Sequence, residues 1–277
     1  MSFRQIIVKD SNYLSLKDNN LLAKYSEADK EIKIPIEDIA IILIESDRTT
    51  LSVKLINKLS QNNIMLIICD EAKKPASIVM PLIGHYRQLE NFYFQLGFKE
   101  VSKQNLWREI IKQKICNQRE VVRLVKGNTD VLEKLFRLEH ETKRNDITNR
   151  EALAARIFFE ELYGTEFKRF VDDKINNTLN FGYTIIVSSI MRQLAVYGLD
   201  MKLGIWHKSK SNMFNLAYDL VEPFRPLVDY FVCENYEFIN KDLSPMIRKK
   251  IVGILNVNVL VNKQKYRLQN ALEIYIK

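Results

Sequence analysis

The stretch that decides the fold class lies near the N-terminus, where residues 39–69 read IAIILIESDRTTLSVKLINKLSQNNIMLIIC. It begins and ends with continuous aliphatic runs, Ile39–Ile44 and Ile64–Cys69, which are typical of strands buried on both faces. Between them, Thr50–Gln61 repeats apolar residues at helical spacing. The pattern predicts two buried strands joined by a helix, the centre of a small mixed sheet.

Weaker signals around this stretch complete a β-rich region. Thr49 or Thr50 is a suitable N-cap for the helix, and Asn19-Asn20 is a plausible turn. The short runs that we expect to form further strands are Phe3–Val8, Tyr13–Leu16, Leu21–Tyr25, Lys33–Ile36 and, as a closing strand, Ser77–Met80.

Beyond residue 85 the pattern is helical almost throughout. The segments with a 3.6-residue period are His85–Leu96, Gln104–Gln118, Asp130–Thr142, Arg150–Tyr163, Phe167–Leu179, Thr184–Tyr197, Asn212–Val221, Leu227–Asn235 and Ser244–Val252. Glycines such as Gly164, Gly182 and Gly198 fall between them and read as breaks. The predicted fold class is α+β, with a small β-rich N-terminal domain (1–85) followed by a larger all-α domain (86–277).

The charge of the chain is concentrated in the helical part. The 277 residues carry a net charge of +8. Residues 1–90 hold equal numbers of basic and acidic side chains, so the whole excess lies in residues 91–277. Clustered basic charge indicates a nucleic-acid surface, although charged helices are also often merely solvated. Three widely spaced cysteines predict free thiols in a reducing cytoplasm, and no apolar run reaches the length of a membrane span.

The candidate chemistry lies in the segment from His207 to Glu222. Asp219 and Glu222 are three residues apart and therefore share a helix face. Imidazole and carboxylate groups are ligands that Mn²⁺ or Mg²⁺ accept. Glu222 directly precedes Pro223 among apolar neighbours, and a buried carboxylate there needs a partner, which a cation supplies. Glu151, in the first turn of another predicted helix, is by itself most often a surface residue.

Four motifs carry a family resemblance over nearly the whole chain: Asn149–Arg156 (NREALAAR), Leu179–Tyr183 (LNFGY), Gly204–Lys208 (GIWHK) and Asn212–Asp229 (NMFNLAYDLVEPFRPLVD). With them the chain resembles the CRISPR-associated integrase, the catalytic subunit of the spacer-acquisition complex (the Cas "one" family), and within it the branch that accompanies type II systems. The family pairs a β-rich N-terminal domain with a helical catalytic domain, so the resemblance implies the same fold class as the patterns.

The resemblance implies a catalytic metal site. By motif, the metal ligands and catalytic residues fall on Glu151, His207 and Glu222, with Asp219 as a further ligand or an acceptor behind the ligands. Tyr218 departs from relatives that have another acid at this position. The implied reaction is Mg²⁺- or Mn²⁺-dependent: the 3′-hydroxyl of a DNA fragment attacks a phosphodiester at a repeat boundary. His207 as ligand, as general acid/base, or as both remain open alternatives.

The same resemblance implies partners. We expect double-stranded DNA (fragment and repeat array), a homodimer formed through the first 85 residues, and a small ferredoxin-like subunit. Lys208, Lys210 and Arg225 are candidate phosphate contacts. An alternative is a catalytically inactive DNA-binding scaffold, against which the retention of all three expected ligands argues. A helical metalloenzyme acting on a small molecule fits poorly, because the Glu-x-x-His pairs of di-iron bundles are missing from the sequence.

Overall fold

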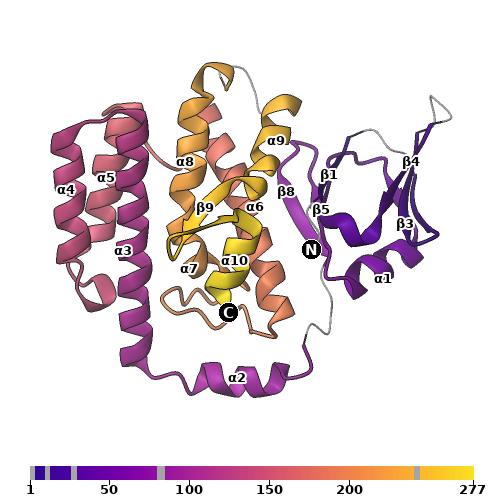
Figure 1. Ribbon diagram of the computed structural model, residues 1–277, viewed down its shortest axis with the longest axis horizontal. Coiled ribbons are helices and arrows are strands. Elements are labelled where there is room, and N and C mark those ends of the chain that lie inside the picture. Colours follow the sequence, from indigo (N-terminus) through magenta and orange to yellow (C-terminus); the bar gives the residue numbers. More distant parts are fainter. Residues whose placement is uncertain (1–3, 10–12, 26–29, 80–84, 240–243) are drawn as a thin grey trace. The chain divides into compact units, whose positions relative to one another are not determined.

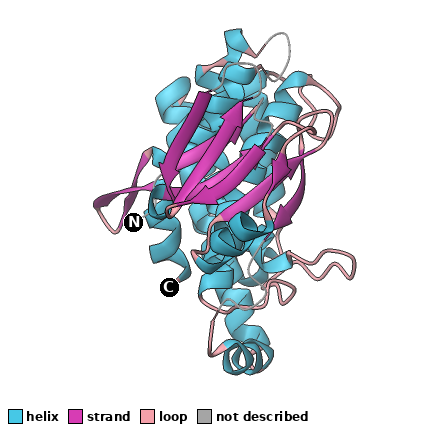
Figure 2. Ribbon diagram, turned by 90° about the vertical axis from the view of Figure 1, so that its right-hand side faces the viewer, coloured by secondary structure: helices cyan, strands magenta, loops and turns pink. Residues whose placement is uncertain are grey.

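The computed structural model describes residues 4–9, 13–25, 30–79, 85–239 and 244–277 (Figure 1). The chain divides into two compact units. The first contains residues 1–88, 192–198 and 255–277, and the second contains residues 89–191 and 199–254. The strands that the structure describes, drawn in magenta in Figure 2, all belong to the first unit. Among the described residues, none of the helices is both long enough and apolar enough to cross a membrane.

The N-terminal part of the first unit contains two four-stranded sheets. The first sheet has the order β1 (Arg4–Val8), β5 (Ile39–Ile44), β7 (Met65–Cys69) and β8 (Pro75–Val79), and the second has the order β4 (Lys30–Pro35), β3 (Asn20–Tyr25), β2 (Tyr13–Lys17) and β6 (Thr50–Leu51). In the first sheet β1, β5 and β7 are parallel and β8 is antiparallel. All six residues of β5 are buried, as the aliphatic run predicted. Of the predicted closing strand, Met80 lies outside the described residues.

The helix between the two aliphatic runs, α1 (Val53–Gln61), begins later than its pattern predicted. Ser52 is the N-cap, and its side chain accepts a hydrogen bond from the backbone N–H of Leu55 at 3.2 Å. The predicted caps Thr49 and Thr50 are wrong, because Thr50 pairs with Tyr13 in the strand β6. The sheet therefore retains the backbone up to Leu51, and Ser52 is the first residue free to cap the helix.

The predicted turn at Asn19-Asn20 is displaced by one residue. Asp18 and Asn19 have positive φ values of 49° and 58°, and Lys17 pairs with Asn20 across the hairpin. Asp and Asn tolerate this left-handed conformation better than other non-glycine residues, which allows a two-residue turn without glycine.

The C-terminal segment departs from the all-helical prediction. Asn258–Val261 (β9) and Gln264–Arg267 (β10) form an antiparallel hairpin, followed by α10 (Leu268–Ile276). Its turn residues Asn262 and Lys263 have positive φ values of 50° and 66°. A polar turn without glycine between two four-residue strands gives a weak sequence signal. This segment belongs to the first unit by its contacts. The predicted boundary between two domains, 1–85 and 86–277, stays a prediction.

The regular secondary structure described in the second unit is entirely helical. Its helices are α2 (Gln88–Leu96, whose first residue belongs to the first unit), α3 (Glu100–Val125), α4 (Thr129–Glu141), α5 (Arg150–Tyr163), α7 (Asn215–Val221), α8 (Arg225–Glu234), α9 (Pro245–Val252) and most of α6 (Lys174–Val196). The long helix α3 packs against α4, α5 and α8 (Figure 1). Short 3₁₀ turns occur at Ile36–Asp38, Arg144–Asp146, Glu222–Phe224, Tyr236–Phe238 and Gly253–Asn256. The predicted α+β class is confirmed.

One pair of predicted helices is a single helix. The patterns placed a break at Gly182, but α6 continues through it from Lys174 to Val196. The glycine serves close packing instead, because a Cβ at this position would lie 2.4 Å from Cγ1 of Val228 on α8. Residues 167–173, predicted as helical, are bends and turns that precede α6.

Candidate active site

Glu151 is held in the first turn of α5 by local capping. Asp146, in the preceding 3₁₀ turn, accepts hydrogen bonds from the backbone N–H groups of Arg150 at 2.8 Å and Glu151 at 3.0 Å. Asn149 enters the helix in the left-handed conformation, with φ of 51°. These contacts satisfy N–H groups that have no partner inside the helix and fix the place of the Glu151 side chain.

Glu222 occupies the 3₁₀ turn between α7 and α8 and is only 6% exposed. Each of its carboxylate oxygens has a cationic partner: Arg225 Nε donates to Oε1 at 2.8 Å and Lys114 Nζ to Oε2 at 2.5 Å. Burial by itself would raise the pKa of Glu222, but the charges and hydrogen bonds of Lys114 and Arg225 outweigh it and lower this pKa to about 2. Glu222 is therefore ionised at neutral pH, as a metal ligand must be.

Lys114 connects the two glutamates. Its Nζ also donates to Glu151 Oε1 at 2.5 Å, so one ammonium group bridges Glu151 and Glu222. The lysine lies on the buried face of α3, and its side chain is 10% exposed. Sequence reasoning missed it, although a lysine at a core-facing position of a helix was the signal that could have revealed it.

His207 lies in the loop between α6 and α7 and is oriented by Asp219. The fully buried Asp219 carboxylate accepts hydrogen bonds from the backbone N–H groups of Ile205 (2.5 Å), Trp206 (3.0 Å) and His207 (3.1 Å), and pairs with His207 Nδ1 at 2.6 Å. A Cβ on Gly204 would lie 2.9 Å from Asp219 Oδ2 and 2.3 Å from the backbone oxygen of His207. The loop can enclose the carboxylate only because residue 204 is glycine.

The imidazole of His207 responds to this setting. The hydrogen bond to Asp219, together with the charge of Asp219, outweighs burial and raises the pKa of His207; Glu222 contributes in the same direction. The loop is also packed by aromatic rings: Trp206 stacks on buried Trp107 of α3 at 5.4 Å between ring centroids, and Trp107 lies edge-on to the imidazole at 6.1 Å. His207 is thus fixed in position and near enough to Glu222 to interact with it electrostatically.

The basic candidates occupy different surroundings. Arg225 is turned inward, where it pairs with Glu222 and lies over the ring of Tyr183 at 4.7 Å. Lys208 is exposed and 3.4 Å from Glu100, and Lys210 is exposed in the same loop. Lys208 and Lys210 therefore stay predictions as phosphate contacts, whereas Arg225 has a structural partner inside the cluster.

The side chains around Lys114 include the donor types that a divalent ion needs. Within the described ranges, no group of three or more His, Cys, Asp or Glu side chains is placed as a ready-made metal site. The Lys114 ammonium group stands between the carboxylates of Glu151 and Glu222, as a cation would. The donor set fits Mg²⁺ or Mn²⁺: two carboxylates converge on one cation, and an imidazole with a carboxylate behind its Nδ1 leaves Nε2 as a donor.

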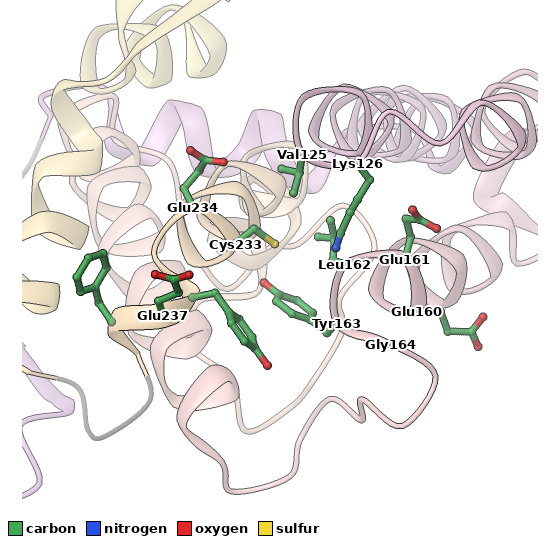
Figure 3. Close-up of a pocket in the computed structure, with 12 residues that line it drawn as sticks. Val125, Lys126, Glu160, Glu161, Leu162, Tyr163, Gly164, Cys233, Glu234 and Glu237 are labelled. Carbon is green, nitrogen blue, oxygen red and sulfur yellow. The ribbon is translucent and has the colours of Figure 1, made fainter.

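A pocket of about 680 Å³ lies at the C-terminal ends of α3, α5 and α8, and none of the predicted site residues line it (Figure 3). It is lined where α3, α5 and α8 end, by residues such as Val125, Tyr163 and Cys233. Along α3, Lys114 and Val125 are separated by roughly 16 Å at 1.5 Å per residue. Burial, the largest influence, raises the pKa of the Cys233 thiol to about 11, which keeps it protonated at neutral pH. The pocket is separate from the acidic cluster.

Comparison with known proteins gives the family. A family model for CRISPR-associated protein Cas1 matches residues 6–243. The CRISPR-associated endonuclease Cas1 of Neisseria meningitidis serogroup C is 33% identical over 99% of this chain and 90% of its own length. Two solved structures share the fold at 20% identity and 98% coverage of this chain: a casposase bound to integration product (TM-score 0.78, 88% of that chain) and a Cas6-RT-Cas1–Cas2 complex (TM-score 0.74, 34% of that chain). The chain therefore belongs to the CRISPR-associated Cas1 family of spacer-acquisition integrases and endonucleases, as its motifs predicted.

Proposed function

We propose that this chain is a divalent-metal-dependent DNA integrase with Glu151, His207 and Glu222 as its catalytic metal ligands. The observation that carries the proposal is the convergence of Glu151 and Glu222 on a single cationic position in a largely buried site. Because Glu151 comes from α5 and Glu222 from the 3₁₀ turn between α7 and α8, only the folded chain brings them together. Mg²⁺ and Mn²⁺ are the ions whose ligand preferences this set meets.

When bound, the ion polarises a phosphodiester and stabilises the leaving oxygen of an in-line displacement. The residues of the chain supply orientation. Asp219 accepts from the backbone of the loop and from His207 Nδ1, which holds the proton at Nδ1 and leaves the lone pair at Nε2. Nε2 is then able to bind the ion or to accept a proton from the attacking 3′-hydroxyl, and these two roles stay open alternatives.

The positive charges of Arg225 and Lys114, which pair with the glutamates, also affect the approach of DNA in this reaction. Arg225 and Lys114 bring two positive charges to a site where a phosphodiester must approach two carboxylates. Their charges reduce the repulsion between the glutamates and the DNA backbone. We propose that Lys208 and Lys210, on the exposed part of the His207 loop, contact phosphates of the same DNA.

The partners belong to the proposal as well. The excess positive charge outside residues 1–90 favours double-stranded DNA, both fragment and repeat array. Integration at both ends of a repeat requires two active sites, so we propose a homodimer formed through residues 1–85 together with a small ferredoxin-like subunit. Support comes from the solved complex in which a similar chain occurs with Cas2 and from the casposase solved with its integration product. The reaction would take place in the prokaryotic cytoplasm.

A strand-transfer assay tests the function against an inactive DNA-binding scaffold. Duplex fragments with 3′-hydroxyl ends or with 3′-deoxy ends are incubated with a plasmid that carries a repeat array, the protein and Mn²⁺. We expect joined product only with the 3′-hydroxyl fragment, and none with Glu222→Gln or with a chelator. DNA binding without joining in any metal would support the scaffold and contradict the proposal.

A further inference from the structure

Lys114 is an unusual side chain for the interior of a protein. A lysine is rarely buried unless it is paired, yet this one is 8% exposed on a helix face that it shares with Ile110, Ile111 and Ile115. Its ammonium group donates hydrogen bonds to Glu151 and Glu222, whose carboxylates are proposed metal ligands. The lysine therefore occupies the place where the ion would be expected to interact.

The charges of the four side chains that contact one another around Lys114 balance without a metal ion. Glu151 and Glu222 contribute two negative charges, and Lys114 and Arg225 contribute two positive charges. Adding a divalent cation to this set leaves two uncompensated positive charges in a partly buried site, where charge interactions are stronger than in water. Removing the ammonium group from between the carboxylates lowers that excess and frees the oxygens on which the two cations converge.

From this arrangement we infer that Lys114 is an internal counter-ion that holds Glu151 and Glu222 together in the metal-free protein and competes with the divalent ion for them. The inference rests on the proposed metal site. Lys114 is a positioning residue in this scheme, since it acts through the two glutamates. If Lys114 only aligned the carboxylates for the ion, its removal would disorder the ligands and weaken metal binding. If it competes with the ion, its removal strengthens metal binding.

The test compares two substitutions at Lys114 with a control on the same helix. Lys114→Met removes the charge and retains the length of the side chain, whereas Lys114→Arg retains the charge. Lys112→Met removes the same charge two residues away, on a different side of α3. Mn²⁺ binding to the full-length protein is measured by titration calorimetry without DNA, and thermal unfolding is measured with a chelator and with Mn²⁺.

For Lys114→Met we expect the Mn²⁺ dissociation constant to fall by about tenfold or more. We also expect a lower melting temperature in chelator and a larger rise on adding Mn²⁺ than in the unmodified protein. Lys114→Arg and Lys112→Met should bind Mn²⁺ no more tightly than the unmodified protein. Equal or weaker binding by Lys114→Met overturns the inference. If the unmodified protein binds no Mn²⁺ at all, the proposed metal site itself is wrong, which separates the two failures.

A measurement on the unmodified protein covers the case in which Lys114→Met does not fold. In protein with ¹⁵N-labelled lysine, the Lys114 ammonium group should give a signal protected from exchange in chelator, identified by its loss in Lys114→Arg. Saturating Mg²⁺ should shift that signal strongly or abolish it, because the ion takes over the carboxylates. A signal that is unchanged by saturating Mg²⁺ would contradict competition.

Discussion

Asp219→Asn is the substitution that isolates the orientation of His207 from the rest of the site. The Asp219 carboxylate accepts from three backbone N–H groups and pairs with His207 Nδ1. An amide of the same shape retains one acceptor oxygen and turns an NH₂ group toward the other donors, so two of the four interactions are lost. At about 1.5–3 kcal/mol for a hydrogen bond to a charged group, the expected loss of stability is about 3–6 kcal/mol.

The effect on activity follows from the proton of His207. Without a carboxylate at Nδ1, the imidazole is no longer fixed with its lone pair at Nε2, the atom that the proposed mechanism uses. Carboxylates that orient metal-binding histidines contribute about 10–100-fold in affinity or activity. We therefore expect strand transfer by Asp219→Asn to fall by at least about tenfold in the temperature range where the variant is still folded.

Thermal unfolding followed by circular dichroism measures the stability change. Tryptophan fluorescence reports on the loop itself, because the only two tryptophans of the chain, Trp107 and Trp206, stack beside His207. Asp200→Asn is a matched control: it changes another aspartate of the same loop, which accepts a backbone N–H of Lys202 at 2.8 Å, and should retain activity. A variant at Asp219 with unchanged stability, fluorescence and strand transfer would refute the orienting role.

Three further predictions follow from the same structure. Strand transfer should be abolished to a similar degree by Glu151→Ala, His207→Ala and Glu222→Ala, and the losses should not add in double variants, because ligands of one ion act together. Survival of activity in folded Glu222→Ala would make Glu222 a structural residue. Burial raises the pKa of Asp229 from 3.8 to about 7, so between these pH values the folded protein binds more protons than the unfolded chain. The free energy of unfolding should therefore fall by about 4 kcal/mol as pH rises from about 4 to above 7. Asp229→Asn should lack this loss in denaturant titrations at several pH values, and a pH profile identical to that of the unmodified protein would contradict the prediction. Gly182→Ala should destabilise the fold by about 1–3 kcal/mol through overpacking, and an unchanged melting temperature would show that α6 and α8 can separate at no cost.

The fold could be predicted to the extent that the burial pattern was regular. Ile39–Ile44 is apolar at every position and is a strand buried on both faces in the structure. The hairpin formed by residues 258–267 was missed, since its strands are short and its turn residues Asn262 and Lys263 adopt positive φ without glycine. Gly182 was interpreted as a break because sequence alone does not show that a second helix packs against it.

The candidate site shows the same division between local motif and tertiary contact. His207 and Glu222 could be proposed from the sequence because one continuous motif contains both. Glu151, in the first turn of α5, could be proposed because the family resemblance extends to it. Lys114 lies 37 residues before Glu151 and 108 before Glu222. The sequence could show a lysine on the apolar face of a helix, but its two partners depend on the packing of α3 against the other elements and are not indicated by any spacing. Asp219 was predicted as a further ligand or an acceptor behind the ligands, but which groups it accepts hydrogen bonds from depends on the loop that encloses it.

The most direct test of the proposed active site is a crystal structure of the protein soaked in Mn²⁺, with the ion located by its anomalous scattering. We expect one strong peak within coordination distance of Glu151 and Glu222 and on the Nε2 side of His207, with the Lys114 ammonium group withdrawn from between the two carboxylates. An ion bound elsewhere with Lys114 still bridging Glu151 and Glu222, in crystals of a protein that joins DNA in Mn²⁺, would contradict this expectation.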